Sequence, residues 1–231
     1  MTSGHLSAQD EADAAASAAR IEIVEAPIPA LIEFLEGIWG AGRVGDQSLI
    51  RAVAHAGNSV LLATRDGATV GAALGVLGWE GGLHLHSHMV AVAPGERASG
   101  VGFAIKLAQR AQCLDNGVTE MRWTFDPLIR RNAHVNLVKL GATVRAFHPN
   151  FYGSLDDAIN GSDATDRFEV SWRLDAPVGG EKASRTDFEL PADYEALRRD
   201  DPAAARELRA RSTAAFTDRT VAFSGTGYAL A

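Results

Sequence analysis

Residues 83–125 constrain the fold of this chain more than any other part of the sequence. An apolar run of strand length, Leu83 to Ala93, leads into a turn that contains glycine, and a helical pattern then runs from residue 100 or 101 to about 115. Asn116-Gly117 is a typical end of a helix, and residues 119–125 are the next strand pattern. Two strands joined through a helix predict a parallel crossover, so the fold must contain a sheet with a helix packed on it.

The patterns on either side of this crossover predict further strands and helices. Asp66-Gly67 between the apolar runs 59–65 and 69–77 favours a tight turn, and so predicts a hairpin. The remaining predicted elements are helices over 28–38, 47–56 and 132–140, and strands over 21–24, 143–147 and 168–174. The order of these elements indicates a mixed α/β fold whose first half is antiparallel.

Composition and spacing divide the chain into three parts. With 46% hydrophobic and 22% charged residues over 231 positions, a globular domain with one core is expected. Residues 1–20 form an Ala-rich acidic N-terminal arm, which could be a short helix or a mobile, disordered segment. Residues 21–176 are the central domain, and residues 177–231 are a C-terminal extension of linker, helix and final strand that packs on the same domain.

Charge and cysteine content exclude several classes of function. A net charge of -7 leaves no electrostatic footprint for a nucleic acid, and no apolar run is long enough to span a membrane. The N-terminus lacks the basic and apolar regions of a secretory signal, so a cytoplasmic protein is expected. Cys113 is the only cysteine, which excludes an intramolecular disulfide, and it is expected to be an inert core residue.

The turn before residue 101 carries the most informative motif of the chain. Glycine lets the backbone turn sharply and approach a ligand without a Cβ in the way. A helix start also presents unpaired N–H groups and the positive end of its dipole, so this turn is suited to bind a phosphate. A tight connection from strand to helix favours glycine as well, and this alternative stays open. The candidate phosphate-binding residues are Arg97, Ala98, Ser99, Gly100, Val101 and Gly102.

This segment resembles motif A of the GCN5-related N-acetyltransferase (GNAT) superfamily, whose signature is Gln/Arg-x-x-Gly-x-Gly/Ala after the fourth strand. Val92, Pro94 and Arg97 also match the family's preceding Val-x-Pro-x-x-Arg pattern. Asn132, followed by a short helix that ends in Lys139-Leu140-Gly141, resembles the family's later CoA-binding element.

The resemblance covers about residues 21–174, the central domain. It is strongest for a subgroup of acetyltransferases with His-Ser-His in the fourth strand, here residues 86–88. The same subgroup has Trp-Thr-Phe-Asp-Pro-Leu in the fifth strand, here residues 123–128.

The resemblance implies the GNAT acyl-CoA N-acyltransferase fold, with a central, partly antiparallel, splayed sheet flanked by helices. Pantetheine would lie between strands 83–93 and 119–125, and the N–H groups of residues 97–102 would hold the pyrophosphate. Asn132 would bond the pantetheine arm, cap its own helix, or do both. The backbone groups that the resemblance pairs with pantetheine belong to Met89, Val90, Ala91 and Val92.

The implied activity is transfer of an acyl group, most simply from acetyl-CoA, to the amine of a small molecule such as an amino acid, by direct attack in a ternary complex. Succinyl-CoA or another acyl-CoA is an alternative donor, and a non-catalytic CoA-binding regulatory domain is an alternative function. A metal, a nucleic acid and a membrane are not expected as partners, whereas the chain could form a homodimer. The C-terminal extension could complete the sheet, cover the acceptor site or build that dimer.

His84, His86 and His88 alternate along the predicted fourth strand, so all three side chains are expected on one face. The resemblance places a general base about eleven residues before Arg97, at His86, and a histidine needs little tuning for this work. His88 could share that role. Two alternatives stay open: a His-x-His metal site, although no Asp or Glu completes an obvious ligand set, and a structural role in the sheet.

The chain departs from the family's pattern at the position of the general acid. The family's usual proton donor to the departing thiolate is a tyrosine in the helix after the fifth strand, and this chain has Leu137 at that position. Tyr152 is the nearest later tyrosine and the candidate acid, while Asn136 or a water could replace it.

Two charged residues near the fifth and last core strands each have two interpretations. Asp126 could hold a substrate ammonium group, or it could begin a turn with the proline that follows it. Arg167 could bind a substrate carboxylate or pair with Asp166. The turn and the pair are the simpler interpretations.

Overall fold

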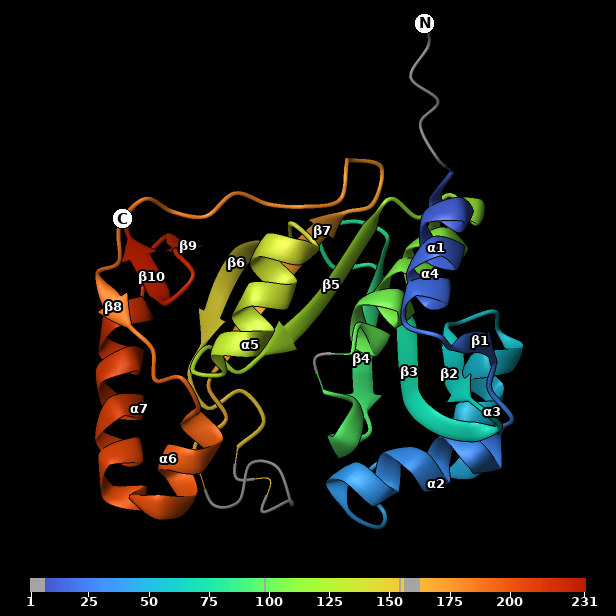
Figure 1. Cartoon of the computed structure of the whole chain (residues 1–231), viewed down its shortest axis with the longest axis horizontal. Coiled ribbons are helices and arrows are strands. Elements are labelled where there is room, and N and C mark those ends of the chain that lie inside the picture. The colour runs from blue at the N-terminus through green and yellow to red at the C-terminus, as the bar shows by residue number, and fades with distance from the viewer. Residues whose placement is uncertain (1–6, 98, 154, 156–162) are drawn as a thin grey trace, which may run out of the picture. The chain divides into compact units, whose positions relative to one another are not determined.

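The computed structural model describes residues 7–97, 99–153, 155 and 163–231. Two compact units make up the chain, residues 1–121 and 122–231, and Figure 1 shows their helices and strands. Both units combine helices with antiparallel strand pairs, so the predicted mixed α/β class is confirmed. Within the described residues, no helix is both long and apolar enough to cross a membrane.

The first unit is built on an antiparallel four-stranded sheet in the order β1-β2-β3-β4. The strands are β1 (Glu22–Glu25), β2 (Val60–Arg65), β3 (Ala68–Gly78) and β4 (His84–Val92). Asp66 and Gly67 join β2 to β3 with φ angles of +50° and +79°, the left-handed pair that a two-residue hairpin turn needs. The predicted hairpin is therefore confirmed.

Helices cover both faces of this sheet. They are α1 (Ala8–Ala18), α2 (Ile28–Trp39), α3 (Gln47–His55) and α4 (Val101–Asp115). On one face, Leu35 of α2 belongs to a buried core with Met89 of β4. On the other face, Ile105 of α4 packs with Ala73 of β3, and α1 lies beside α4 (Figure 1). Alternate residues of the strands therefore serve two separate cores.

Helix α1 lies in the predicted N-terminal arm. Ser7 caps its first turn, since the Ser7 hydroxyl accepts from the Asp10 N–H at 3.1 Å and the Asp10 carboxylate accepts from the Ser7 N–H at 3.0 Å. Glu11 forms an ion pair with Arg110 of α4. Residues 8–18 are thus a helix that packs on the first unit.

The second unit contains two sheets, in the orders β5-β7-β6 and β8-β10-β9. The strands are β5 (Glu120–Phe125), β6 (Thr143–His148), β7 (Arg167–Arg173), β8 (Phe188–Glu189), β9 (Val221–Phe223) and β10 (Gly227–Leu230). The helices are α5 (Arg130–Ala133), the π-helical segment η2 (His134–Lys139), α6 (Tyr194–Asp200) and α7 (Pro202–Phe216). In the part of the chain that the structure describes, the strands β8, β9 and β10 of the C-terminal extension form a sheet of their own. They do not add to the sheet that contains β5, β7 and β6.

An aromatic cluster joins the C-terminal extension to the rest of the second unit. The ring of Phe168 on β7 lies 5.0 Å from that of Phe216 on α7 and 5.3 Å from that of Tyr228 on β10, measured between centroids. Phe125 and Phe147 contact the same Phe168 ring from β5 and β6. Residues 177–231 therefore supply part of the hydrophobic core of this unit.

Candidate cofactor and catalytic site

The candidate phosphate-binding turn joins β4 to α4 in the first unit. After β4 the chain forms the short 3-10 helix η1 (Pro94–Glu96), and Arg97 then has extended backbone angles. Ala98 lies outside the described residues. Gly100 has a φ of +90° directly before α4, a conformation that other residues adopt only with strain. The predicted start of the helix at residue 100 or 101 is confirmed.

The start of α4 can bind an anion. The first hydrogen bond within the helix runs from the Ala104 N–H to the Gly100 carbonyl oxygen at 2.9 Å. The N–H groups of Val101, Gly102 and Phe103 therefore have no acceptor inside the helix, and the positive end of the helix dipole lies with them. This is the arrangement that phosphate groups use at the N-termini of helices.

One acidic residue, Glu96, lies in this turn, and its charge is compensated. Arg65 at the end of β2 forms an ion pair with the Glu96 carboxylate and also donates to the Ala19 carbonyl oxygen at 2.9 Å. The hydrogen bond from Arg65 lowers the pKa of Glu96, so this carboxylate stays ionised and paired. The Ser99 hydroxyl donates to the Glu96 carbonyl oxygen at 2.6 Å. The described residues of the turn therefore present no uncompensated negative charge to an anion.

Residues 89–92 form the last part of β4. Their backbone pairs with residues 71–74 of β3. The side chains of Met89 and Ala91 belong to the core beneath α2, whereas those of Val90 and Val92 pack toward α4. Pairing of that backbone with pantetheine stays a prediction.

β4 contains a bulge between His86 and Met89. Positions 74 and 76 of β3 pair with positions 89 and 86 of β4, so Ser87 and His88 together lie opposite a single residue. An extra residue of this kind interrupts the two-residue alternation of side chains. His84 and His86 lie in regular register and His88 lies within the bulge, so a shared face for all three histidines stays a prediction.

The three histidines have different surroundings. His84 is buried, with Nδ1 2.7 Å from the Gly82 carbonyl oxygen, and a Cβ added to Gly78 would lie 2.7 Å from His84 Nε2. His86 is half-buried, and its ring centroid lies 5.9 Å from that of His88. His88 is the most exposed of the three, and the desolvation that it does experience lowers its pKa. His84 is thus a packing residue, and His86 and His88 are the candidates for proton transfer.

The sequence patterns do not predict the buried polar network behind the bulge. Lys106 Nζ donates to Ser87 Oγ at 2.8 Å, and Ser87 Oγ donates to Gln109 Oε1 at 2.8 Å. Gln109 Nε2 in turn donates to Ser59 Oγ at 3.2 Å. Burial lowers the pKa of Lys106 well below the ordinary lysine value. A serine inside an apolar strand is the only signal of this network in the sequence.

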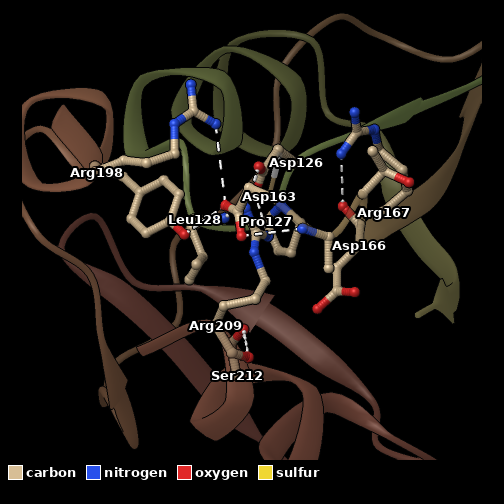
Figure 2. A network of polar contacts seen from close by, with 12 residues as sticks. Asp126, Pro127, Leu128, Asp163, Asp166, Arg167, Arg198, Arg209 and Ser212 are labelled. Atoms are coloured by element: carbon tan, nitrogen blue, oxygen red, sulfur yellow. Dashed lines mark hydrogen bonds and ion pairs between the residues drawn. The ribbon is translucent and has the colours of Figure 1, made fainter. Parts of the chain in front are cut away.

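In the second unit, Tyr152 lies against β5. Its hydroxyl oxygen is 3.1 Å from Thr124 Oγ1, and its backbone N–H donates to Thr165 Oγ1 at 2.9 Å. The Arg167 guanidinium lies over the ring, 5.5 Å from its centroid. Arg167 also donates to the Asp166 carbonyl oxygen at 2.9 Å (Figure 2). Tyr152 is 37% exposed. These contacts therefore hold the Tyr152 side chain, the candidate general acid, in place and leave it accessible to solvent.

The helix after β5 begins earlier than predicted. α5 starts at Arg130, with Ile129 as the N-cap residue, and continues as η2 to Lys139. Asn132 lies inside the first turn, so its interpretation as the helix cap is wrong. Its side chain is half-buried and stays a candidate for CoA binding. Leu137, at the position of the family's tyrosine, is only 7% exposed and has no proton to donate.

Asp126 has structural partners on both of its carboxylate oxygens. Oδ1 accepts from the Leu128 N–H at 2.9 Å, which confirms the turn interpretation. Arg209 of α7 donates to Oδ1 at 2.9 Å and to Oδ2 at 2.6 Å, and also to Asp163 Oδ2 at 3.0 Å (Figure 2). Nothing in the sequence marks Arg209 as important, because its partners lie 83 and 46 positions away.

Metal binding has no support in the described parts of the chain. No group of three or more histidine, cysteine, aspartate or glutamate residues among them is arranged to hold an ion.

Comparison with known proteins finds matches among solved structures, while no protein-family model and no curated protein matches the chain. The ribosomal-protein-S18-alanine N-acetyltransferase from Escherichia coli is 15% identical, with a TM-score of 0.54 over 71% of this chain and 99% of that one. A GNAT-family acetyltransferase from Streptococcus pneumoniae is 14% identical, with a TM-score of 0.53 over 66% and 98%. The Salmonella typhimurium protein yncA, solved with its cofactor acetyl-CoA, is 17% identical, with a TM-score of 0.51 over 71% and 99%.

These similarities cover nearly all of each matched protein and about two thirds of this chain. At such low identity, a structural match is evidence of the fold and not of the activity. The chain has the fold of GNAT acetyltransferases.

Proposed function

We propose that the protein is an acyl-CoA-dependent N-acyltransferase, which transfers an acyl group, most simply acetyl, to the amine of a small molecule such as an amino acid. The observation that carries the proposal is the left-handed Gly100 at the start of α4, directly after β4, in a chain with the GNAT acetyltransferase fold. That turn offers backbone N–H groups to an anion. The similar structure of yncA was solved with acetyl-CoA.

Donor binding in this proposal relies on backbone groups. The N–H groups at the start of α4, those of residues 100–102, hold the CoA pyrophosphate, and the backbone of residues 89–92 pairs with the pantetheine amides. The side chain of Asn132 bonds the pantetheine arm. A net charge of -7 does not oppose this binding, because the helix start and its N–H groups attract an anion locally.

The proposed chemistry is direct aminolysis of the thioester. His86, assisted by the neighbouring His88, takes the proton of the amine, and the amine nitrogen forms a bond to the acyl carbon. The carbon–sulfur bond breaks, and the departing thiolate takes a proton from the Tyr152 hydroxyl. The products are the amide and free CoA, after which His86 gives its extra proton to solvent and Tyr152 takes one from solvent.

The direct test measures thiol release from acetyl-CoA and succinyl-CoA against a panel of amino acids and simple amines. Turnover that depends on both the donor and an amine supports the proposal. Tight CoA binding without turnover for any acceptor would instead support a non-catalytic CoA-binding domain, the function that Leu137 favours.

Gly102→Asp is expected to weaken acetyl-CoA binding about tenfold or more, because a carboxylate in the first turn of α4 repels the pyrophosphate. The same carboxylate favours the helix dipole, so the free energy of unfolding should stay within about 0.5 kcal/mol or rise. A Cβ at this position would lie 3.4 Å from Val92 Cγ2, which a small adjustment accommodates. Calorimetric titration with acetyl-CoA measures the change.

Gly102→Asn is the control for this substitution, because it has the same shape without the charge. If Gly102→Asn weakens binding as much as Gly102→Asp does, steric interference explains the loss and the charge argument fails. If neither variant changes the affinity for CoA, the start of α4 is not the pyrophosphate site.

His86→Gln is expected to lower kcat/KM for the amine about a hundredfold near neutral pH, the usual contribution of a general base. The loss should shrink as the pH rises, because more of the amine then arrives without its proton. A pH series of initial rates measures both effects. His84→Gln, a change at the buried packing histidine, is the comparison, and a similar pH profile for the two variants would refute the role of His86.

A further inference from the structure

The buried carboxylate of Asp166 holds the segment that carries Tyr152. Asp166 is 2% exposed, and its Oδ1 accepts from the Asn150 N–H at 2.9 Å. Its Oδ2 accepts from the Thr213 hydroxyl at 2.6 Å. Thr213 belongs to α7, so helix α7 of the C-terminal extension is connected through Asp166 to the backbone two residues before Tyr152.

The backbone at this connection needs support. Asn150 has a φ of +47°, a left-handed conformation that costs free energy in residues other than glycine. The Asn150 side chain accepts from the Thr165 N–H at 3.2 Å, and the Thr165 hydroxyl donates to the Gly153 carbonyl oxygen at 2.9 Å. Asp166 and Thr165 thus hold both sides of the turn that directs the Tyr152 ring toward Thr124 of β5.

A second contact from α7 reaches the end of β5 itself. Arg209, one helical turn before Thr213, binds Asp126 at the end of β5 and also Asp163 (Figure 2). One face of α7 therefore contacts Asp126 at the end of β5, the strand against which the Tyr152 hydroxyl lies. The same face contacts Asp163, two residues before Thr165.

We propose that helix α7 positions the Tyr152 hydroxyl against β5, with Thr213 and Asp166 as positioning residues and Tyr152 as the proton donor that replaces the missing tyrosine at position 137. The proposal rests on the proposed acyltransferase function. In the step concerned, the carbon–sulfur bond of the donor breaks, the thiolate of CoA takes the phenolic proton, and solvent later returns a proton to Tyr152. The C-terminal extension thereby has a catalytic purpose beyond packing.

Thr213→Val is the test of this arrangement, because it removes one hydroxyl and keeps the shape of the side chain. We expect kcat to fall about tenfold with an unchanged KM for acetyl-CoA, since only the placement of the donor changes. Tyr152→Phe should lower kcat about a hundredfold. Adding Thr213→Val to Tyr152→Phe should cause no further loss, because both substitutions remove the same contribution.

Thr217→Val is the matched control, one turn further along α7. The Thr217 hydroxyl donates only to the Thr213 carbonyl oxygen of its own helix, at 2.7 Å, and the residue is exposed. This variant should keep the parent kcat. Equal losses for Thr213→Val and Thr217→Val, or losses that add in the Tyr152→Phe background, would overturn the proposal.

A readout without turnover separates this proposal from the proposed function. The chain has three tyrosines, and Tyr194 and Tyr228 are buried. Fluorotyrosine labelling therefore gives three 19F resonances, and the one that Tyr152→Phe removes belongs to Tyr152. Thr213→Val should shift that resonance, and Thr217→Val should not. An unmoved resonance refutes the positioning by α7 whether or not the protein is active, whereas an enzyme inactive with every donor and amine refutes the proposed function instead.

Discussion

Arg209→Met is expected to lower the free energy of unfolding by about 3–5 kcal/mol, the usual cost of removing one partner from a buried ion pair. Arg209 has a side chain that is 5% exposed, and those of its partners Asp126 and Asp163 are 12% and 9% exposed. Methionine fills much of the same volume but leaves two buried carboxylates without their shared cation. The loss of charge pairing, not a cavity, is thus the cause of the effect.

The surroundings of Arg209 provide little compensation. Its guanidinium carbon lies 5.0 Å from the centroid of the Tyr194 ring, so the substitution also removes a cation–π contact. Arg198 lies 4.0 Å from Asp163, at the limit of an ion pair (Figure 2). Asp126 would keep only its hydrogen bond from the Leu128 N–H.

Chemical denaturation followed by tryptophan fluorescence measures this effect, because Trp123 and Trp172 pack against each other in the same unit. Arg199→Met is the matched control. Arg199 pairs with Asp200 at the surface, with side chains 70% and 67% exposed, and such a pair contributes at most about 1 kcal/mol. Similar stability of the two variants would mean that the Arg209 network contributes no more than a surface pair.

Lys106→Met is expected to raise the free energy of unfolding near pH 7, with a gain that shrinks as the pH approaches 10. Burial lowers the pKa of Lys106 well below the ordinary lysine value. Between that lowered pKa and the ordinary value of about 10.4, the unfolded chain binds a proton that the folded chain does not. Stability therefore rises with pH in this window, by up to about 1.4 kcal/mol per unit, and methionine removes that dependence.

The substitution leaves no polar group of the network without a partner. Ser87 Oγ, which accepts from Lys106, still donates to Gln109 Oε1 at 2.8 Å. The methionine side chain matches the length of the lysine stem, and Met121 Sδ already contacts Lys106 Nζ at 3.8 Å.

Urea denaturation of both proteins at pH 7, 8 and 9 measures the difference between them. Lys139→Met, a change at an exposed lysine, is the control, and its difference from the parent protein should not vary over this range. A Lys106→Met variant that is less stable by the same amount at every pH would show that the buried lysine is charged and paired in the folded protein.

Local patterns predicted most of the helices and strands of this protein. The Asp66-Gly67 turn and the helix over 101–115 are where the sequence indicates them, because turn chemistry and helical periodicity depend only on neighbouring residues. The helix after β5 was less well predicted. Its start at Arg130, with Ile129 as the N-cap residue, lacks the polar cap that marks the start of most helices.

In the candidate site too, local features were predicted from the sequence and features that depend on strand pairing were not. The left-handed Gly100 lies directly before α4, where the sequence predicts the turn, while phosphate binding there stays a prediction. The bulge at Ser87–His88 was not predicted, since it arises from the pairing of β4 with β3. A bulge depends on the partner strand, so the alternation of a single strand cannot reveal it.

By itself, the sequence determined the strand, turn and helix of residues 83–115, because glycine's conformational freedom and the two periodicities are properties of the local chain. Only the tertiary structure decided that β4 has a bulge at Ser87–His88 and which cation neutralises Asp126. Arg209 lies 83 positions from Asp126, and packing of the C-terminal extension on the aromatic core brings the two together. A contact of this kind depends on how distant elements pack, and no pattern of neighbouring residues encodes it.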